Sequence, residues 1–491
     1  MRRSTIVTTC WVILIASVGS AGAQTERPLV RYAASFDSQL TQPRAEQPIP
    51  LPQPPEQPTL PRPPLPRRPL PRPPRAPRIP RTPATSPAAR NAAFLTLATV
   101  PFMIGDSAAG SCSSVSFMGQ TDAIVEHPIL ACSRLNISEN NTALLQNRTY
   151  LSYRHFHDVT KTRIFRIGGN FQFVSNLNID RFTYGVEQTI LNGGVSIETR
   201  IPMSRELGSR MDVIFDSVTP ARDTLPLTDR DGEFGNISIV AKTLLYQNDR
   251  FLVSTGFGVT LPTANDVVVD GEINGGLIII EGTPGLHAFS DLDFDVHVRN
   301  ETVNVSPFLA WIWVPNDRFF HQGFLQFDIA ANSARGHITS SGTIDTFTAG
   351  TFVPRESIAV DADEAAQLIQ QTLMRLNLGI GYWVYQNPDS MWLQRLATLL
   401  ELHYTTTLQN AKVHEAELLK YTVDQFGGAI DLPVNIMVGN GANRNDIVNL
   451  SMGTAAEMNN WMIINGLIIP LSGGDNKAFD FEYNVQFQRR F

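Results

Sequence analysis

Segments of about ten residues with alternating apolar and polar side chains recur from about residue 131 to the carboxyl terminus. Two of them are RFTYGVEQTI, from Arg181, and GVSIETRIP, from Gly194, and the LNGG between them is typical of a tight hairpin turn. A period of two places alternate side chains on opposite faces of a strand. The pattern therefore predicts antiparallel strands with one apolar face and one polar face.

The connections between these strands alternate between short and long. Short turns are predicted at residues 191–194, 247–250, 315–318 and 386–390, and long connections at 202–234, 262–302, 331–372 and 409–445. An outer-membrane barrel has tight periplasmic turns and long extracellular loops, whereas a soluble sandwich has no reason to sort its loops by end. The sequence predicts an all-β fold, an antiparallel transmembrane β-barrel.

The number of strands follows from parity. If both ends of the barrel chain are periplasmic, the strand number is even, as in single-chain bacterial barrels. Counting SRLNISEN, residues 133–140, as the first upward strand gives about 14 strands. The alternative is 12, because the segments after Ser133 and Asp446 are weak strand candidates.

Composition agrees with crossing by strands. The chain has 43% hydrophobic and 17% charged residues, and its mean hydropathy is -0.08, which argues against a bundle of membrane helices. The longest apolar candidate after the amino terminus, AAFLTLATVPFMIG at 92–105, is too short to span a bilayer as a helix and contains Pro101.

The amino terminus predicts export. Arg2 and Arg3 precede the apolar run WVILIASVG and the small residues AGA, so residues 1–23 are expected to be a signal peptide. The remaining chain has two cysteines, Cys112 and Cys132, which are a candidate disulfide because exported proteins meet an oxidising compartment.

Residues 24–90 are rich in proline and arginine and are predicted to be a disordered periplasmic linker with polyproline II character. Eight arginines lie between Arg62 and Arg90 without an acidic neighbour. The segment is either a solvated spacer or an arm that contacts an anionic cell-wall polymer or the acidic barrel. Residues 91–130 are expected to form a plug or a periplasmic segment, and residues 131–491 the outer-membrane barrel.

The chain ends with an alternating aromatic strand, AFDFEYNVQFQRRF. One predicted face carries Phe479, Phe481, Tyr483, Val485, Phe487 and Phe491. We expect this face to meet lipid and the face with Glu482 to meet the lumen. The strand resembles the assembly signal of Gram-negative outer-membrane barrels, which implies that Phe487 and Phe491 are recognised by the barrel-assembly machinery.

The resemblance extends over nearly everything after residue 100. PFMIGD at 101–106, RLNISENNTALLQNRTYLSYRHFHDV at 134–159, ELHYTTTL at 401–408, DIVNLSMG and the final strand look like an uncharacterised family of planctomycete outer-membrane barrels. The resemblance implies a barrel in the bacterial outer membrane, in contact with its lipid. It implies no chemistry.

One segment predicts a helix. In VDADEAAQLIQQTLMRL, from Val360, Ala366, Ile369, Leu373 and Leu376 recur at helical spacing, and Asp361 or Asp363 can cap the helix. Its position in a long connection predicts a loop that either narrows the mouth of the barrel or lies on its surface.

Gly105-Asp106-Ser107 begins an esterase-like motif, but no Asp-x-x-His pair follows near the carboxyl end. We predict no enzyme, no cofactor or metal site, and no nucleic-acid partner.

Two functions remain. The first function is a passive channel or small-solute transporter of unknown substrate. The second is a structural barrel that anchors the outer membrane through its Pro-rich arm. The candidate lumen-lining residues are Glu187, Glu198, Arg200, Lys242, Asp328, Glu401 and Glu482.

Overall fold

The computed structural model describes residues 97–106, 113–118, 124–129, 134–164, 173–205, 210–216, 224–228, 232–279, 287–347, 354–419, 422–425, 428–431, 434–439, 446–473, 477 and 479–491. The chain divides into two compact units, Met1–Pro80 and Arg81–Phe491, and every described residue belongs to the second. The predicted signal peptide, the Pro/Arg-rich linker, Cys112, Cys132 and Ser107 lie outside the described residues.

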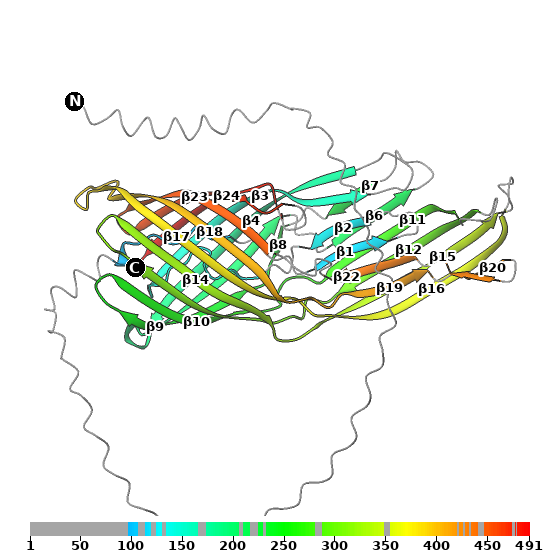
Figure 1. Cartoon of the computed structure of the whole chain (residues 1–491), viewed down its shortest axis with the longest axis horizontal. Coiled ribbons are helices and arrows are strands. Elements are labelled where there is room, and N and C mark those ends of the chain that lie inside the picture. The colour runs from blue at the N-terminus through cyan, green and yellow to red at the C-terminus, as the bar shows by residue number, and fades with distance from the viewer. Residues whose placement is uncertain are drawn as a thin grey trace, which may run out of the picture. The chain divides into compact units, whose positions relative to one another are not determined.

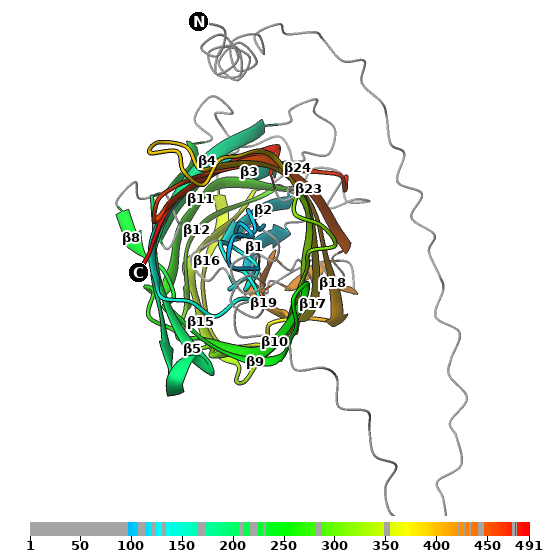
Figure 2. The ribbon, with the colours of Figure 1, turned by 90° about the vertical axis from the view of Figure 1, so that its left-hand side faces the viewer.

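Twelve antiparallel strands form a closed barrel (Figure 2). They are β3 (Arg148–Ile164), β4 (Phe173–Ile190), β5 (Val195–Arg205), β9 (Ser238–Gln247), β10 (Phe251–Thr260), β13 (Asn304–Trp313), β14 (Phe319–Ala330), β17 (Thr372–Gln386), β18 (Arg395–Gln409), β23 (Asp446–Met458), β24 (Trp461–Pro470) and β25 (Phe481–Arg490). β25 pairs with β3, and β4 pairs with β5, which closes the ring. The predicted barrel is confirmed with the alternative number of 12 strands, and the number 14 is wrong.

The segment predicted as an additional first strand, residues 133–140, takes no place in the wall. From Arg134 onward it runs inside the barrel, where Asn136, Ser138 and Glu139 are buried. The physical reason is its composition: a spanning strand must present an apolar face to lipid, and this segment has mostly polar side chains.

Short and long connections alternate as predicted. A 3₁₀ turn, η1 (Leu191–Gly193), joins β4 to β5, and similarly short links join β9 to β10, β13 to β14, β17 to β18 and β23 to β24. Figure 1 shows these turns at one end of the barrel, and further sheets at the other end, which we call the extension.

Two sheets make up most of the extension. One has the order β16-β15-β12-β11-β6-β7 and the other β19-β22-β1-β2. Their strands are β1 (Ser113–Met118), β2 (Ile124–Ile129), β6 (Arg210–Asp216), β7 (Thr224–Thr228), β11 (Val267–Ile279), β12 (His287–Val298), β15 (Ala334–Phe347), β16 (Pro354–Leu368), β19 (His414–Leu419) and β22 (Val434–Gly439). Three short strands, β8 (Gly232–Phe234), β20 (Thr422–Gln425) and β21 (Gly428–Asp431), complete the set.

The predicted helix from Val360 is wrong. Its first half belongs to β16, which pairs with β15 from Leu368 opposite Ala334 to Pro354 opposite Phe347, and its second half begins β17. The same residues also fit a period of two, because Asp361, Asp363 and Ala365 are exposed while Ala366 and Leu368 are buried. Pairing with β15 supplies backbone hydrogen bonds that decide in favour of the strand.

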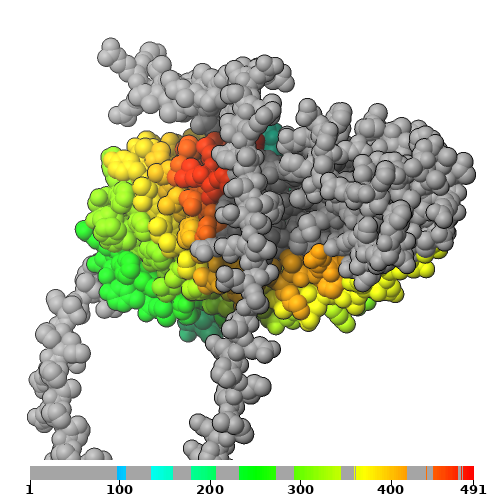
Figure 3. Space-filling view, turned by 45° about the vertical axis from the view of Figure 1, so that its right-hand side comes forward, coloured from blue at the N-terminus to red at the C-terminus, as the bar shows by residue number. Residues whose placement is uncertain are grey.

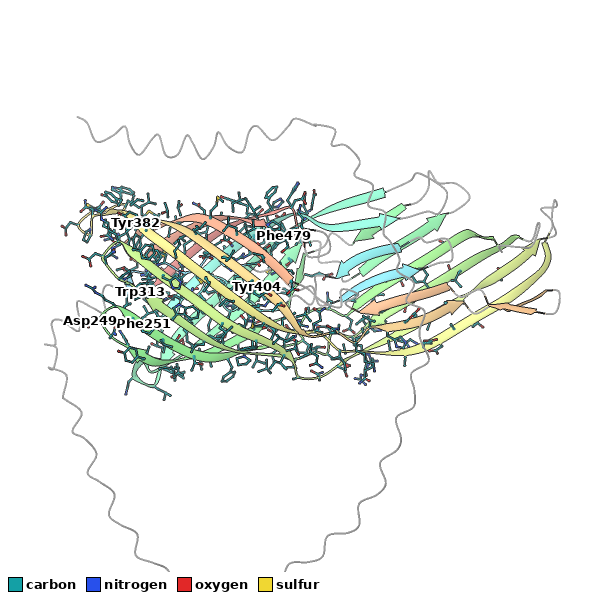
Figure 4. The ribbon with its side chains drawn as sticks, viewed as in Figure 1. Asp249, Phe251, Trp313, Tyr382, Tyr404 and Phe479 are labelled. Carbon is teal, nitrogen blue, oxygen red and sulfur yellow. The ribbon has the colours of Figure 1, made fainter. Side chains whose placement is uncertain are left out.

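The wall of the barrel is polar inside and apolar outside. On β18, Glu401 and His403 are each 1% exposed, while Leu400 and Leu402 between and beside them are 43% and 42% exposed. Figure 3 shows side chains covering the outer wall along the green to red part of the chain. Near the short turns, Figure 4 shows Phe251, Trp313 and Tyr382, of which the last two are exposed. A water-soluble domain has the opposite arrangement.

The final strand also has apolar side chains outside and polar side chains inside, but one residue differs from the prediction. Tyr483 and Phe487 are exposed on the outer face of β25, and Glu482, Asn484 and Gln486 are buried on the inner face. Phe479, which we predicted on the outer aromatic face, precedes the strand and is fully buried. Its ring packs edge-on against Phe156, with 5.9 Å between the ring centroids. The alternation of outward and inward side chains ends there because Phe479 precedes the first residue of β25, Phe481.

Candidate functional site

Two stretches of chain lie inside the barrel, residues 97–106 and residues 134–147, which together we call the inner segment. Arg490 Nη1 donates a hydrogen bond of 2.9 Å to the carbonyl of Ala98, at the end of the barrel with the short turns. Arg134 Nη1 donates to the carbonyl of Gln371 next to the start of β17, at the end with the extension. The inner segment therefore occupies the lumen along much of its length.

The first stretch is held by a carboxylate of the wall. Glu401, on β18, accepts hydrogen bonds from the backbone N–H groups of Ile104 (2.8 Å) and Gly105 (2.9 Å), one on each oxygen. Gly105 has a φ of +73°, and a Cβ there would lie 2.4 Å from the Cα of Glu139. Only glycine permits this backbone, because it tolerates positive φ and close approach. The local turn thus presents two donors to one carboxylate.

Arg154, on β3, binds the carbonyl groups of the same stretch, whereas Glu401 binds its N–H groups. It donates to the carbonyls of Ile104 (2.6 Å) and Gly105 (3.4 Å) and forms ion pairs with Glu482 and Glu139. The side chain of Ile104 packs against the wall where Gly453 and Gly466 leave space, since a Cβ on either would lie 2.8 Å from its Cδ1. Hydrogen bonds and close packing together fix residues 104–105.

The second stretch is held mainly through its backbone. Arg200 donates to the carbonyls of Asn136 (3.0 Å) and Ile137 (3.2 Å). Gln326 accepts from the N–H of Ile137 (2.8 Å) and donates to the carbonyl of Leu135 (2.7 Å). The wall therefore recognises this stretch by its peptide groups as much as by its side chains.

Five charged groups meet beside the second stretch. Arg148 forms ion pairs with Glu187 (2.7 Å) and Glu198 (3.0 Å). Lys242 lies 3.0 Å from Glu187, and Arg200 lies 3.1 Å from Glu198. All five side chains are nearly inaccessible to solvent. Buried charges are tolerated in such a place only when each is paired and hydrogen-bonded.

All seven residues predicted to line the lumen lie inside the barrel and are buried. The structure brings Glu187, Glu198, Arg200 and Lys242 together in one cluster. Glu401 binds the first stretch directly, whereas Glu482 pairs with Arg154, which binds that stretch. Asp328 lies apart with Arg375, at 2.6 Å from its Nε. These residues bind other parts of the protein and not open water, because the inner segment fills the space between them.

Sequence reasoning missed the arginines that pair with these carboxylates. Arg148 and Arg154 lie on one face of the strand in NRTYLSYRHFH, so the period of two could have identified them. The sequence predicts a wall strand around Arg134 and a helix around Arg375. Neither prediction identifies these two side chains as buried inside the barrel, where the structure has them.

No family model matches the chain, and no curated protein matches it. It is similar to solved structures of an outer membrane channel from Pseudomonas putida F1 (10% identity, TM-score 0.38, covering 73% of this chain and 100% of that one) and of the toluene transporter TbuX from Ralstonia pickettii (13%, 0.32, 71% and 90%). A third is the translocator domain of the autotransporter NalP from Neisseria meningitidis (10%, 0.29, 72% and 91%). At these TM-scores the similarity carries no argument about function.

Within the described part of the chain, no helix has the length and apolar character needed to span a membrane. The same residues contain no group of three or more His, Cys, Asp or Glu side chains arranged to hold a metal ion.

Proposed function

We propose that this protein is an outer-membrane β-barrel that conducts small solutes and that its lumen is closed in this structure by the inner segment. The observation that carries the proposal is the inverted polarity of a closed barrel. Apolar side chains such as Leu400 and Leu402 face outward, and ionisable ones such as Glu401 face inward. Lipid outside and an aqueous path inside select this arrangement.

The attachment of the inner segment supports a path that opens. Its peptide groups bind charged side chains of the wall, including Glu401, Arg154 and Arg200. When such contacts separate, water can replace each hydrogen bond, so the net loss per bond is small compared with its strength in a dry medium. An apolar plug in an apolar lumen would lack that compensation.

The position of Ala98 bears on the amino-terminal arm. Ala98 lies beside Arg490, at the end with the short turns, which is periplasmic in outer-membrane barrels, and this supports the proposal that the Pro/Arg-rich segment before it is periplasmic in a bacterial outer-membrane protein. The arginines of that segment are the reason to propose an anionic cell-wall polymer as its partner. Membership of the planctomycete family and recognition of Phe487 and Phe491 by the assembly machinery belong to the same proposal.

A structural, anchoring barrel is the second candidate. The observation that favours it is the filled lumen, with buried residues from both stretches of the inner segment. If the inner segment never moves, the barrel is a closed wall that ties the arm to the membrane. The two functions differ in whether ions pass.

Conductance of the full-length protein in planar bilayers tests the proposal, with Glu401→Ala as the informative variant. The substitution removes the acceptor of two backbone donors, Ile104 and Gly105. Each hydrogen bond to a charged group contributes about 1.5–3 kcal/mol, so the loss of both should raise the ratio of displaced to seated inner segment by roughly a hundredfold or more. We expect wild-type channels to open rarely and the variant to open often.

Leu400→Ala is the control, because it changes the outward neighbour on the same strand. It should leave the open probability at the wild-type level. If neither wild type nor Glu401→Ala conducts, although both migrate as folded barrels on unheated gels, the channel is rejected in favour of the structural barrel.

A further inference from the structure

Arg375, near the extension end of β17, has buried donors without a partner. Its side chain is fully buried, and its Nε donates to Asp328 Oδ2 at 2.6 Å. Neither Nη1 nor Nη2 has a hydrogen-bond acceptor among the described residues. The charge of Arg375 is paired with Asp328, but buried donors without acceptors are unfavourable, so a guanidinium with both terminal nitrogens unsatisfied points to something that binds there.

The surroundings of Arg375 have an excess of positive charge. The partner carboxylate of Asp328 is already engaged, because its Oδ1 accepts from Ser306 Oγ (2.7 Å) and Gln326 Nε2 (2.5 Å). Arg134, on the inner segment and not on a spanning strand, is a second guanidinium in this region, because Gln326 Nε2 donates both to Asp328 and to the carbonyl of the next residue, Leu135. Burial lowers the pKa of Arg134 to about 10; the charge of Asp328 opposes this shift and that of Arg375 adds to it. The charge of one carboxylate therefore acts on two cations.

The chemistry of these donors selects the class of ligand. Arg134 uses Nη1 for the carbonyl of Gln371, and its Nε is also unpaired. The two Nη atoms of Arg375 form a planar fork, which matches two oxygens of a carboxylate or a phosphate. An anion between two guanidinium groups turns their repulsion into attraction to a common partner. A cation or an apolar solute would leave the donors unsatisfied.

We propose that Arg375 and Arg134 bind the oxyanion group, carboxylate or phosphate, of a small solute inside the barrel. In the conformation described, the Nη atoms are closed to solvent, so an anion reaches them only when the inner segment shifts, and Arg134 must stay within reach of Arg375 as it does so. The inference thus rests on the movement in the proposed function and adds the charge class of the solute.

The position of Arg375 fits a site reached before the closure at residues 104–105. Arg375 pairs with Thr405 on β18, beside Tyr404 labelled in Figure 4, and Gly379 pairs with Glu401. Four residues along a strand span roughly 13 Å. A solute that enters from the extension end would meet the two arginines before it meets the stretch held by Glu401.

Isothermal titration of the full-length protein in detergent with inorganic phosphate and, separately, with acetate tests the inference. At least one anion should bind the wild type, and Arg375→Gln and Arg134→Gln should each weaken that binding by about tenfold or more, as expected for loss of a charge-assisted pair. Arg395→Gln removes the same charge from a wall arginine paired with Glu457 near the short turns, and should change the affinity less than about twofold by comparison.

Comparison of phosphate with acetate distinguishes the two kinds of oxyanion group that the solute can carry. Binding of phosphate alone assigns a phosphate-bearing solute, and binding of acetate alone a carboxylate. Absence of binding by both anions, or equal weakening in Arg395→Gln, overturns the inference. Anion binding by a protein that never conducts would reject the channel and keep the site, whereas conduction without anion binding would reject the site and keep the channel. If Arg375→Gln fails to fold, Arg134→Gln still tests the site, because Arg134 is on the inner segment and its substitution leaves the strands of the wall unchanged.

Discussion

Single residues decide how the lumen is closed, and they do so through backbone geometry. Gly105 is held at positive φ so that its N–H and that of Ile104 point at one carboxylate. A side chain at this position would meet Glu139, which belongs to the second stretch of the inner segment. Gly105 thus couples the two stretches.

Gly105→Ala should loosen the inner segment. The positive φ costs a non-glycine residue about 1–2 kcal/mol, and the added Cβ would also lie 2.4 Å from Glu139 Cα. We expect a higher open probability in planar bilayers. Gly193→Ala is the matched control, because Gly193 also has a positive φ, +82°, but nothing lies within 4 Å of its Cβ position. Equal effects from both substitutions would show that contact with Glu139 is unimportant.

Removal of Phe491 should affect assembly more than stability. Its side chain is 72% exposed on the outside, and full burial of such a side chain contributes roughly 1.5–3 kcal/mol, a loss that an inserted barrel can survive. If the terminal residue is recognised during insertion, its deletion should lower the amount of protein in the outer membrane severalfold while the inserted fraction keeps its heat stability.

Tyr483→Ala is the control for that experiment. Tyr483 lies on the same outer face of β25, 41% exposed and away from the terminus. Phe479 cannot serve, because it is buried against Phe156. An equal insertion defect in Tyr483→Ala would mean that lost apolar area explains the effect and that Phe491 is not a signal.

At the scale of elements, the extension carries charge repulsion between neighbouring strands. Asp270 on β11 lies opposite Asp295 on β12. Partial burial, and then the nearby carboxyl group of Asp270, raise the pKa of Asp295, while His297 and His337 act in the opposite direction. Like charges directly opposite each other destabilise a strand pair.

Asp295→Asn should therefore stabilise the β11–β12 pair at neutral pH, by up to about 1 kcal/mol. A carboxyl group whose pKa is raised by folding destabilises the folded state above that pKa, and this effect disappears as pH falls below its ordinary value near 4. Protection of β11 and β12 from hydrogen exchange, corrected for intrinsic rates, should increase in the variant at pH 7.5 and by much less near pH 4.

Asp363→Asn on β16 provides the contrast, because its carboxylate lies 3.5 Å from His337 Nε2 and its removal brings no relief of repulsion. A gain in protection from this substitution equal to that from Asp295→Asn would contradict the role of the Asp270–Asp295 pair.

For the whole molecule, closure of the ring between β3 and β25 is the event that makes the barrel. It pairs Arg148 with Arg490 and His157 with Phe481, and leaves no edge of the wall unpaired. Deletion of residues 43–87 should leave this closure intact, since all twelve wall strands lie between Arg148 and Arg490. The truncated protein should still migrate differently on gels when unheated and when boiled. Failure to fold would show that the arm takes part in the fold.

The class of the fold could be predicted from the sequence, because the signal for it is local. Every wall strand must place one face in lipid and the other in the lumen, so each carries the period of two wherever it pairs. The sorting of short and long connections, and the inward position of residues such as Glu198 and Glu401, follow from the same constraint. The helix predicted from Val360 is wrong because that sequence fits both the helical period and the period of two of a strand.

The contents of the lumen could not be predicted from the sequence, because they depend on contacts between distant parts of the chain. Ile104 and Glu401, which close it together, are 297 residues apart in the chain, and no local pattern records such a pairing. The sequence of residues 134–140 resembles a strand, but in the folded chain residues 137–140 form turns, and whether such a segment enters the wall depends on whether neighbouring strands accept its backbone. The wall residues Arg200 and Gln326 bind that backbone instead, because the ring of 12 strands is already closed without it.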